Sequence, residues 1–454
     1  MDIWHHLIFR IELITLSIMI FMFSLWLSIS LRWIQLRCFK LAWNVLSERI
    51  KKFQDINQLT QFEALSMGLS GTLGIGNITV VASVILLAGP GSVFWLLVSA
   101  FLGMSVKFCE ATLGCKYRNM QSNEMAIGGP MVTLSGLLSS YKYLPSWPLK
   151  SIVYINSIAM LIIVLALGNW LQVSQMHYLL ASSSQVMLHH EYVVTLIILI
   201  TFILMVRGQD WGHLSHWVAR LVPISLLVYV IFGLSIILMH LDQVMNVIVL
   251  IIKDAFQFNQ GSERFLFVFS IGMILGMVTH ESGLGISSIA HASAKSRNPI
   301  CQGLVAMLEP FIDTMIICLI TAFVLLIAIE NGFQLVGLNA NNIQYAYMWF
   351  IPWFSDVFIG IVCIMTLSCI LSSFFYANQL ISFICQRSVK PFMLAVFCVL
   401  IIIGQSIPFI WLVPAICWIL PFVIIPNMYS IIVMLNRIKQ DLSVYQQASD
   451  RFVN

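Results

Sequence analysis

The sequence predicts an all-α, polytopic integral membrane protein with about eleven transmembrane helices. Hydrophobic residues make up 60% of the 454 residues and charged residues only 9%, whereas a soluble globular domain carries roughly 25% charged residues. Because so few charged side chains cannot cover a water-facing surface, lipid is expected to be the solvent for most of the chain. The apolar residues also gather in runs that approach the about 20 residues a helix needs to cross the hydrocarbon.

The apolar runs follow one another along the whole chain, and the strongly polar stretches between them are short. The first run, from Ile11 to Leu31, is long for a signal peptide and no cleavage pattern follows it, so we expect a retained spanning helix. The whole chain, 1–454, is therefore expected to be a single transmembrane domain. The runs centre near Ile20, Thr79, Phe101, Leu161, Ile198, Val228, Ile274, Leu319, Met365, Val399 and Val423.

Lysine and arginine residues set the expected orientation. If every run spans the membrane, the basic clusters, from Arg32 to Lys52 through to Arg437 and Lys439, all fall on one side. By the positive-inside rule this side is cytoplasmic, which places the N-terminus outside and the C-terminus in the cytoplasm of a cell whose plasma or inner membrane holds the protein. The net charge of +4 (23 minus 19) reflects this loop bias and gives no reason to expect nucleic-acid binding.

Two of the predicted spans are interrupted by glycine. The first contains Gly71, Gly74 and Gly76 and ends in Asn77; the second runs from Gly272 through Gly276 to Gly283 and Gly285. A glycine inside a helix costs about 1 kcal/mol relative to alanine, so such clusters predict that the backbone leaves the helix. Unwound backbone at membrane depth survives only where it is buried or lines a cavity, and its freed N–H and C=O groups can bind solute and ion. Gly68 alone is better explained by close helix packing.

The two interruptions echo each other. The segments Leu73–Gly76 and Leu284–Ser287 lie about 211 positions apart (284 minus 73), each in the first span of a five-span block, and the two blocks have opposite orientations. Matched broken helices in opposed blocks are typical of inverted-repeat transporters. The predicted division is 1–60 for an extra N-terminal helix and a cytoplasmic linker, 61–240 and 241–440 for the repeats, and 441–454 for a cytoplasmic tail.

Ionisable residues inside a membrane are costly and usually functional. Glu281 at the second interruption is expected to latch helices together or to bind a proton or ion, and its neighbour His280 is able to titrate near neutral pH. Lys107 and Glu110, spaced i and i+3, are expected to pair with each other or to extend toward the cytoplasmic interface. Asp313 lies one turn after Glu309 in an apolar span.

Other kinds of chemistry have no support in the sequence. The 10 cysteines are scattered, mostly in apolar runs, without a C-x-x-C pair, so neither a transition-metal site nor a disulfide framework is expected. The chain also has no Walker A phosphate-binding loop and no arrangement of a hydrolase triad. We therefore expect no enzyme and no cofactor, and ion-coupled secondary transport is the simplest remaining function.

Motifs along nearly the whole chain resemble those of the sodium:alanine (alanine or glycine:cation) symporter family. They include Gly71-Thr-Leu-Gly-Ile-Gly-Asn-Ile78, Glu110-Ala-Thr-Leu113, Gly128-Gly-Pro-Met131 and Glu281-Ser-Gly-Leu-Gly285. The resemblance implies a LeuT-like fold, in which two inverted five-helix repeats follow one extra helix. It also implies sodium-coupled import of a small neutral amino acid, such as alanine or glycine, by a protein that is expected to be a monomer in the lipid bilayer.

The resemblance implies two sets of binding residues. The substrate would contact both interruptions and one further span, through Thr72, Gly74, Gly76, Asn77, Gln172, Thr279, His280 and Gly283. Sodium would be bound by the unwound backbone near Ser70 and Leu73 and by Ser368 and Cys369 of the ninth span. Ser368 and Cys369 form a small polar stripe with Ser372 and Ser373, and interhelical packing is an equal alternative role for this stripe.

The sequence departs from the family pattern within the expected site. Val278-Thr-His-Glu-Ser-Gly283 stands where the family usually has Phe-Ser-Asn-Glu-Ala-Gly, and Cys369 stands where threonine is common. A wider pocket would admit a larger amino acid, and sulfur is a poorer sodium ligand than oxygen. Two alternatives therefore stay open: a proton-coupled carrier of a different amino acid, with His280 involved, and a solute-binding sensor or scaffold that does not transport.

Overall fold

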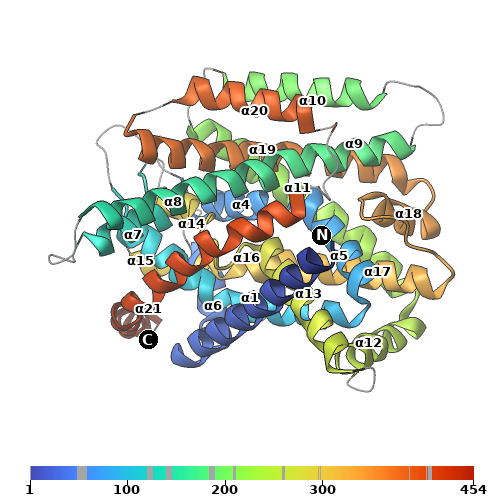
Figure 1. Cartoon of the computed structure of the whole chain (residues 1–454), viewed down its shortest axis with the longest axis horizontal. Helices are drawn as coiled ribbons and strands as arrows, with labels where there is room; N and C mark the ends of the chain where they lie inside the picture. Colours follow the sequence, from blue (N-terminus) through green and yellow to red (C-terminus); the bar gives the residue numbers. More distant parts are fainter. Residues whose placement is uncertain are drawn as a thin grey trace.

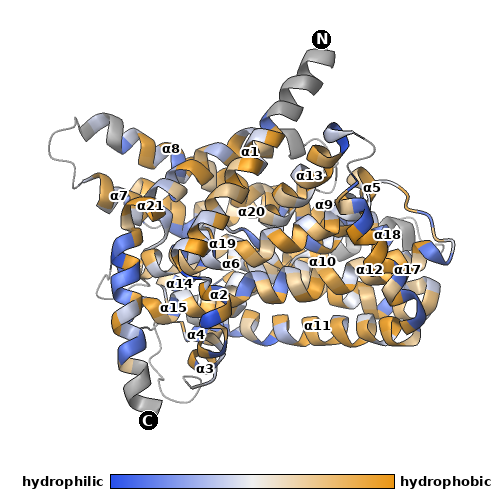
Figure 2. Ribbon diagram, turned by 90° about the horizontal axis from the view of Figure 1, so that it is seen from below, coloured by the Kyte–Doolittle hydropathy of each residue, from blue (hydrophilic) through white to orange (hydrophobic). Residues whose placement is uncertain are grey.

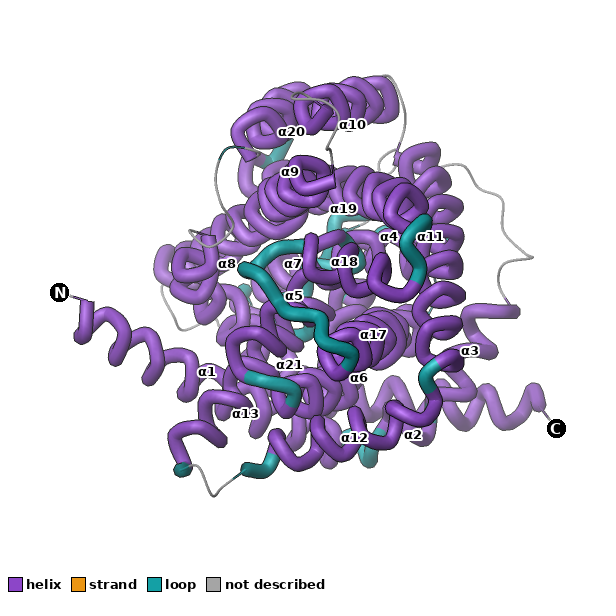
Figure 3. The backbone as a smooth tube through the Cα atoms, turned by 90° about the vertical axis from the view of Figure 1, so that its right-hand side faces the viewer, coloured by secondary structure: helices purple, strands orange, loops and turns teal. Residues whose placement is uncertain are grey.

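The structure is a computed structural model, and every regular element in its described part is helical (Figure 3). It describes residues 2–48, 59–119, 126–139, 146–183, 190–207, 211–257, 261–294, 296, 298–387, 389–404, 406 and 412–453. Two short stretches, η1 and η3, have the wider π-helical hydrogen-bond pattern. The all-helical class predicted from the sequence is confirmed for this part of the chain.

The elements have the following bounds. In the first half of the chain they are α1 Asp2–Ser30, α2 Ile34–Arg37, α3 Phe39–Glu48, α4 Gln61–Thr72, α5 Ile75–Ala88, α6 Gly91–Lys116, α7 Pro130–Leu138, α8 Ser146–Leu165, η1 Ala166–Trp170, α9 Leu171–Ser183, α10 His190–Val206 and α11 Trp211–Met239. In the second half they are α12 Leu241–Ala255, α13 Ser262–His280, α14 Ser288–Ala292, α15 Pro299–Ala306, α16 Leu308–Pro310, η3 Phe311–Cys318, α17 Leu319–Glu330, α18 Asn341–Phe350, α19 Phe354–Cys385, α20 Lys390–Gly404 and α21 Leu412–Val453.

Among the described residues, eight helices are long and apolar enough to cross a membrane, and α4 with α5 makes a ninth if this bent pair is one span. Two shorter apolar helices cover Thr195–Val206 and Lys390–Gly404. Each run predicted from the sequence has its centre inside one of these helices. The polytopic architecture is thus confirmed, while the count of eleven spans and the pairing of two inverted repeats stay predictions.

The outer faces of the helices suit a lipid environment. Large apolar side chains are exposed on several of them, for example Ile224 and Leu227 of α11, each 60% exposed. Figure 2 shows the hydrophobic colour on α10, α11 and α12 and a hydrophilic C-terminal part of α21. In a soluble protein most of these large apolar side chains would be buried away from water. Their exposure on the outer faces of the helices is expected for a surface that contacts lipid.

The helices form layers across the molecule. At one edge α10 packs on α20, with α9 and α19 beneath them, and α12 and α13 lie near the opposite edge (Figures 1 and 3). Helix α6 lies inside and packs against α13, α15, α12, α14 and α1. Its side chains from Leu102 to Cys115 are all buried.

Both glycine clusters interrupt helices, as predicted. Helix α4 starts with a capping box, in which Thr60 and Glu63 satisfy each other's backbone N–H groups, and ends at Thr72; α5 then continues at an angle of 45°. Helix α13 ends at His280, and the backbone after it has positive φ at Glu281, Gly283 and Gly285. We call residues 73–74 the first break and residues 281–287 the second break.

Three further glycines serve close packing. A Cβ atom on Gly272 would lie 2.5 Å from the Ser92 carbonyl oxygen of α6, and one on Gly276 would lie 3.0 Å from Ser99 Cβ. Both glycines lie inside regular α13, so they belong to the α13–α6 contact and not to the break. A Cβ on Gly68 would lie 1.9 Å from Glu309 Oε1, which confirms the packing role predicted for Gly68.

Candidate functional site

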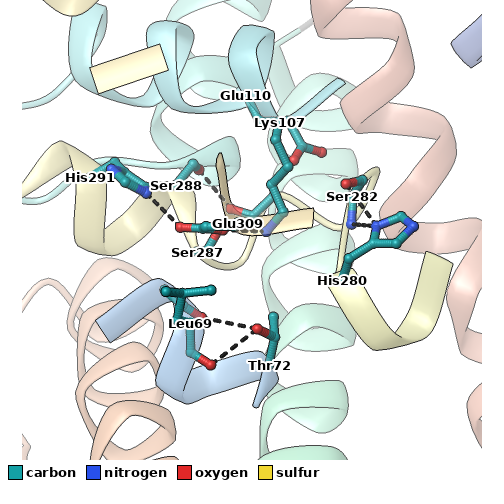
Figure 4. A network of polar contacts seen from close by, with 12 residues as sticks. Leu69, Thr72, Lys107, Glu110, His280, Ser282, Ser287, Ser288, His291 and Glu309 are labelled. Atoms are coloured by element: carbon teal, nitrogen blue, oxygen red, sulfur yellow. Dashed lines mark hydrogen bonds and ion pairs between the residues drawn. The ribbon is translucent and has the colours of Figure 1, made fainter. Parts of the chain in front are cut away.

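The first break leaves the start of α5 without a side-chain cap. Its N-cap residue, Gly74, has no side chain, and no cap hydrogen bond is made there. The Thr72 hydroxyl instead turns back and donates to the carbonyl oxygens of Gly68 and Leu69, at 3.4 and 3.1 Å (Figure 4). An uncapped helix N-terminus presents N–H groups and a partial positive charge, which favour an anionic group such as a carboxylate.

Gln172 lies directly against this break. An ideal Cβ on Gly74 would be 2.1 Å from Gln172 Oε1, and one on Gly76 would be 2.9 Å from a methyl carbon of Leu171. Gln172 follows the π-helical turn η1, and its Nε2 donates to the Leu167 carbonyl at 3.0 Å. Its buried Oε1 has no hydrogen-bond partner in the described part of the chain, so an acceptor faces the break.

Asn77 joins the two broken helices. Its Nδ2 donates to the Thr279 carbonyl oxygen, in the last turn of α13, at 3.1 Å and to Asp313 Oδ1 at 2.7 Å. Asp313 belongs to η3 and is fully buried, and its second carboxylate oxygen has no hydrogen-bond partner among the described residues. A backbone oxygen of α13 and a carboxylate oxygen of η3 thus converge on the Asn77 amide. The second Asp313 oxygen beside them is a ligand of the kind that a hard cation prefers.

Helix α19 covers the other side of the first break. Cys369 Sγ lies 3.4 Å from the Gly71 carbonyl oxygen, and the Tyr376 hydroxyl donates to the Met67 carbonyl at 2.9 Å. The Ser368 hydroxyl donates to Met365 of its own helix at 2.9 Å. The Ser70 hydroxyl is buried without a hydrogen-bond partner within the described ranges. Of the two α19 residues expected at a sodium site, Cys369 contacts the last turn of α4, just before the first break, and Ser368 is bonded inside its helix.

His280 and Gly283 face α6 and α21. The ring of His280 lies between the Ser99 hydroxyl, at 3.1 Å from Nε2, and the Ser282 hydroxyl, at 2.8 Å from Nδ1. The Gly283 N–H donates to Glu110 Oε1 at 2.8 Å, and the Gly283 carbonyl accepts from the Asn427 amide at 2.9 Å. In the structure the polar groups of both residues are occupied by protein partners away from the first break.

The expected pairing of Lys107 with Glu110 is wrong. Lys107 Nζ lies 2.9 Å from Glu309 Oε2, and both side chains are 1% exposed. Glu110 instead binds the Gly283 N–H and the Asn427 amide. The i, i+3 spacing puts both residues on one face of α6, but that face is buried against the second break and not exposed at an interface.

The structure therefore brings most of the predicted residues together and separates three of them. One group surrounds the first break and consists of Ser70, Thr72, Leu73, Gly74, Gly76, Asn77, Gln172, Thr279 and Cys369. His280 and Gly283 lie on the α6 side of the second break, and Ser368 is bonded within α19. The substrate and sodium roles of all these residues stay predictions.

The comparison with known proteins decides the family. The family model described as "Sodium:alanine symporter family" matches residues 3–452, almost the whole chain. The chain belongs to the sodium:alanine symporter family. It is a membrane transport protein and not an enzyme.

Individual relatives have moderate sequence identity to this member of the symporter family. A transporter of Haemophilus influenzae is 30% identical over 329 residues, which cover 71% of this chain and 69% of that protein. The sodium/alanine symporter AgcS of Methanococcus maripaludis is 32% identical over 276 residues, 60% of this chain and 58% of that protein. The probable sodium/glutamine symporter GlnT of Bacillus subtilis is 23% identical over 372 residues, 81% of this chain and 74% of that protein.

The fold of this family member is shared with a more distant transporter. The crystal structure of a mutant of the Eremococcus coleocola manganese transporter superposes with a TM-score of 0.54 and covers 82% of each chain. The sequence identity is only 12%, so this likeness concerns the fold alone.

Two residues of the site were missing from the predicted set. The sequence shows Asp313 as an acid in an apolar span, but nothing in the sequence places it beside Asn77. Asn427 of α21, which binds the second break, gave no sequence signal beyond being an amide in an apolar helix. A search for every polar residue inside a predicted span would have found both.

Proposed function

We propose that this chain is a secondary active, sodium-coupled importer of a small neutral amino acid such as alanine or glycine. The observation that carries the proposal is the first break, where the uncapped N-terminus of α5 lies beside the unpartnered amide oxygen of Gln172. The α5 N-terminus suits a carboxylate, and the Gln172 oxygen suits an ammonium group. A zwitterionic amino acid carries both groups.

The tight packing around the first break favours a small substrate. Side chains of α9 stand against both Gly74 and Gly76, and the glycines leave no side chain of their own in that space. The names of two relatives, a sodium/alanine symporter and a probable sodium/glutamine symporter, support an amino acid as the substrate class.

Two groups of oxygen atoms support cation coupling. The Thr279 carbonyl and the Asp313 carboxylate, which both accept from the Asn77 amide, form one group. The first break beside α19, with Ser70, the Gly71 carbonyl and Cys369, forms the other. In the proposed cycle, one helix bundle rocks against the remaining helices around the breaks, as in inverted-repeat carriers. The N-terminus lies outside and the C-terminus in the cytoplasm.

Radiolabelled alanine uptake into proteoliposomes tests the proposal, with inward sodium and proton gradients imposed separately. We expect accumulation driven by sodium. Accumulation driven by protons alone would replace sodium coupling by proton coupling. Saturable alanine binding without accumulation under either gradient would favour a sensor or scaffold over a carrier.

The cysteine at the first break gives a prediction about sodium affinity. Replacing Cys369 by serine puts a hard oxygen where a thiol lies 3.4 Å from the Gly71 carbonyl, and sodium prefers oxygen ligands. We expect the sodium concentration for half-maximal uptake to fall about threefold to tenfold. This change in affinity corresponds to one added contact with the free energy of a typical hydrogen bond.

Cys363→Ser provides the matched control, because Cys363 is a half-buried cysteine on the same helix. It should leave the sodium dependence unchanged. If Cys369→Ser also leaves the sodium dependence unchanged, Cys369 is not part of the sodium site.

A further inference from the structure

A buried chain of polar contacts connects α6 to the second break and to Glu309, which packs on the helix before the first break. Lys107 Nζ lies 2.9 Å from Glu309 Oε2 and donates to the Ser287 hydroxyl at 2.6 Å. The other carboxylate oxygen of Glu309 lies 2.6 Å from His291 Nε2. Figure 4 shows Glu309 between Lys107 and His291, with Ser287 close by. All four residues are at most 1% exposed.

One end of this chain of contacts reaches the second break, and the other reaches the helix that precedes the first break. Ser287 is the last residue of the second break and precedes α14. Glu309 packs onto Gly68, which lies one turn before the end of α4; a Cβ at Gly68 would be 1.9 Å from Glu309 Oε1. Lys107 therefore holds the second break directly and reaches the helix before the first break through one neighbour.

A second attachment lies one turn further along α6. Glu110 accepts a hydrogen bond from the Gly283 N–H at 2.8 Å, and Asn427 of α21 binds the Gly283 carbonyl. The second break is thus fixed to α6 at both Gly283 and Ser287. At the first break, in contrast, the described contacts leave Gln172 Oε1 and the start of α5 available.

Stability alone does not account for a buried ion pair at this place. Taking two charges out of water costs several kcal/mol per ion, and apolar replacements of similar volume are often neutral or stabilising. The pair differs from such a replacement in its directed bonds, which fix Ser287 and Glu309 relative to α6. This specificity suggests a role in holding the breaks in register.

We propose that Lys107 is a positioning residue that couples the two breaks, so that they shift together during transport. The proposal rests on the transport function proposed above. It predicts that loosening the Lys107–Glu309 pair loosens the first break as well as the second, although Lys107 bonds directly only to the second.

The decisive variant is the double replacement Lys107→Met with Glu309→Gln. Lys107→Met alone leaves the Glu309 carboxylate buried with only His291 opposite it, so this single variant is expected to fold poorly. The double variant removes both charges and should keep a melting temperature close to that of the wild type. The matched control is Lys116→Met with Asp441→Asn, which removes another α6 ion pair whose side chains are 29% and 38% exposed.

Hydrogen–deuterium exchange on the full chain in lipid nanodiscs measures the coupling. In the double variant we expect faster exchange in peptides covering both 66–78 and 279–290, about tenfold in each, while 150–165 of α8 is unchanged. The surface-pair control should match the wild type in all three segments. Faster exchange confined to 279–290, or no change in either segment, would overturn the coupling.

Transport separates positioning from a merely structural role. The double variant should bind alanine with nearly the wild-type affinity but take it up about tenfold more slowly at saturating alanine. Lys107→Arg, which keeps the positive charge, should take up alanine faster than the double variant but more slowly than the wild type. Wild-type uptake by a folded double variant would overturn the positioning role. Failure of the wild type itself to accumulate alanine would count against the transport function, while the exchange result would still decide the coupling.

Discussion

Asp313→Asn is expected to lower the sodium affinity of uptake by about a hundredfold, because it removes the charge from a buried carboxylate. Asparagine keeps the shape of the side chain and an oxygen that accepts from Asn77, which lies 2.7 Å from Asp313 Oδ1. Its second branch, however, becomes an amide that cannot bind a cation, at a place where the Asp313 Oδ2 has no hydrogen-bond partner in the described structure. The sodium dependence of alanine uptake in proteoliposomes measures the effect.

The melting temperature of this variant distinguishes loss of function from loss of fold. Burying a carboxylate without a matching positive charge is costly, so Asp313→Asn should melt no lower than the wild type. Asp356→Asn removes the same charge from an exposed position at the start of α19 and should leave uptake unchanged. An unchanged sodium affinity in Asp313→Asn would restrict the proposed ion site to the Cys369 side of the first break.

The parts of the fold that sequence could predict depend on local pattern. A span needs only a long apolar run, and the predicted runs near Thr79 and Leu319 fall inside helices of the structure. Breaks need glycine, and both predicted clusters end helices, at Thr72 and at His280. These predictions work because membrane insertion and helix propensity act over neighbouring residues.

Contacts between distant segments could not be predicted in the same way. Lys107 and Glu110 are neighbours on α6, and the sequence offers them as each other's partners, yet Lys107 binds Glu309 and Glu110 binds Gly283. Asn77 meets Asp313 across 236 positions. Choosing such partners requires the packing of several helices against α6, which no single segment contains.

The second of the two glycine-interrupted spans shows why residue type alone does not define a structural role. Gly272 and Gly276 lie inside α13 and allow it to approach α6, whereas Gly283 and Gly285 adopt positive φ after the helix has ended. The sequence joins all four into one glycine-rich interruption. Only the structure separates glycines that provide space from glycines that provide backbone freedom.

Gly74→Leu is expected to lower the rate of alanine uptake about a hundredfold or more, while the protein remains in the membrane. Gly74 has φ −95° and ψ −176°, an extended conformation that any residue can adopt, so the effect arises from space and not from backbone strain. A Cβ there would already lie between 2.1 and 2.5 Å from three atoms of the Gln172 amide. A leucine side chain would displace Gln172 and cover the start of α5, where we place the substrate. Uptake and membrane abundance of the same preparations measure the two parts of this prediction.

Two further variants test whether the effect of Gly74→Leu is specific to the first break and to Gln172. Gly360→Leu on α19 adds the same side chain where no atom lies within 4 Å, and it should insert and transport normally. Gly74→Ala combined with Gln172→Ala relieves the crowding but removes the amide oxygen that faces the break. We expect this pair to melt like the wild type and still to bind alanine poorly. Normal binding by the pair would mean that the Gln172 oxygen does not recognise the substrate, and normal uptake by Gly74→Leu would remove the first break from the binding site altogether.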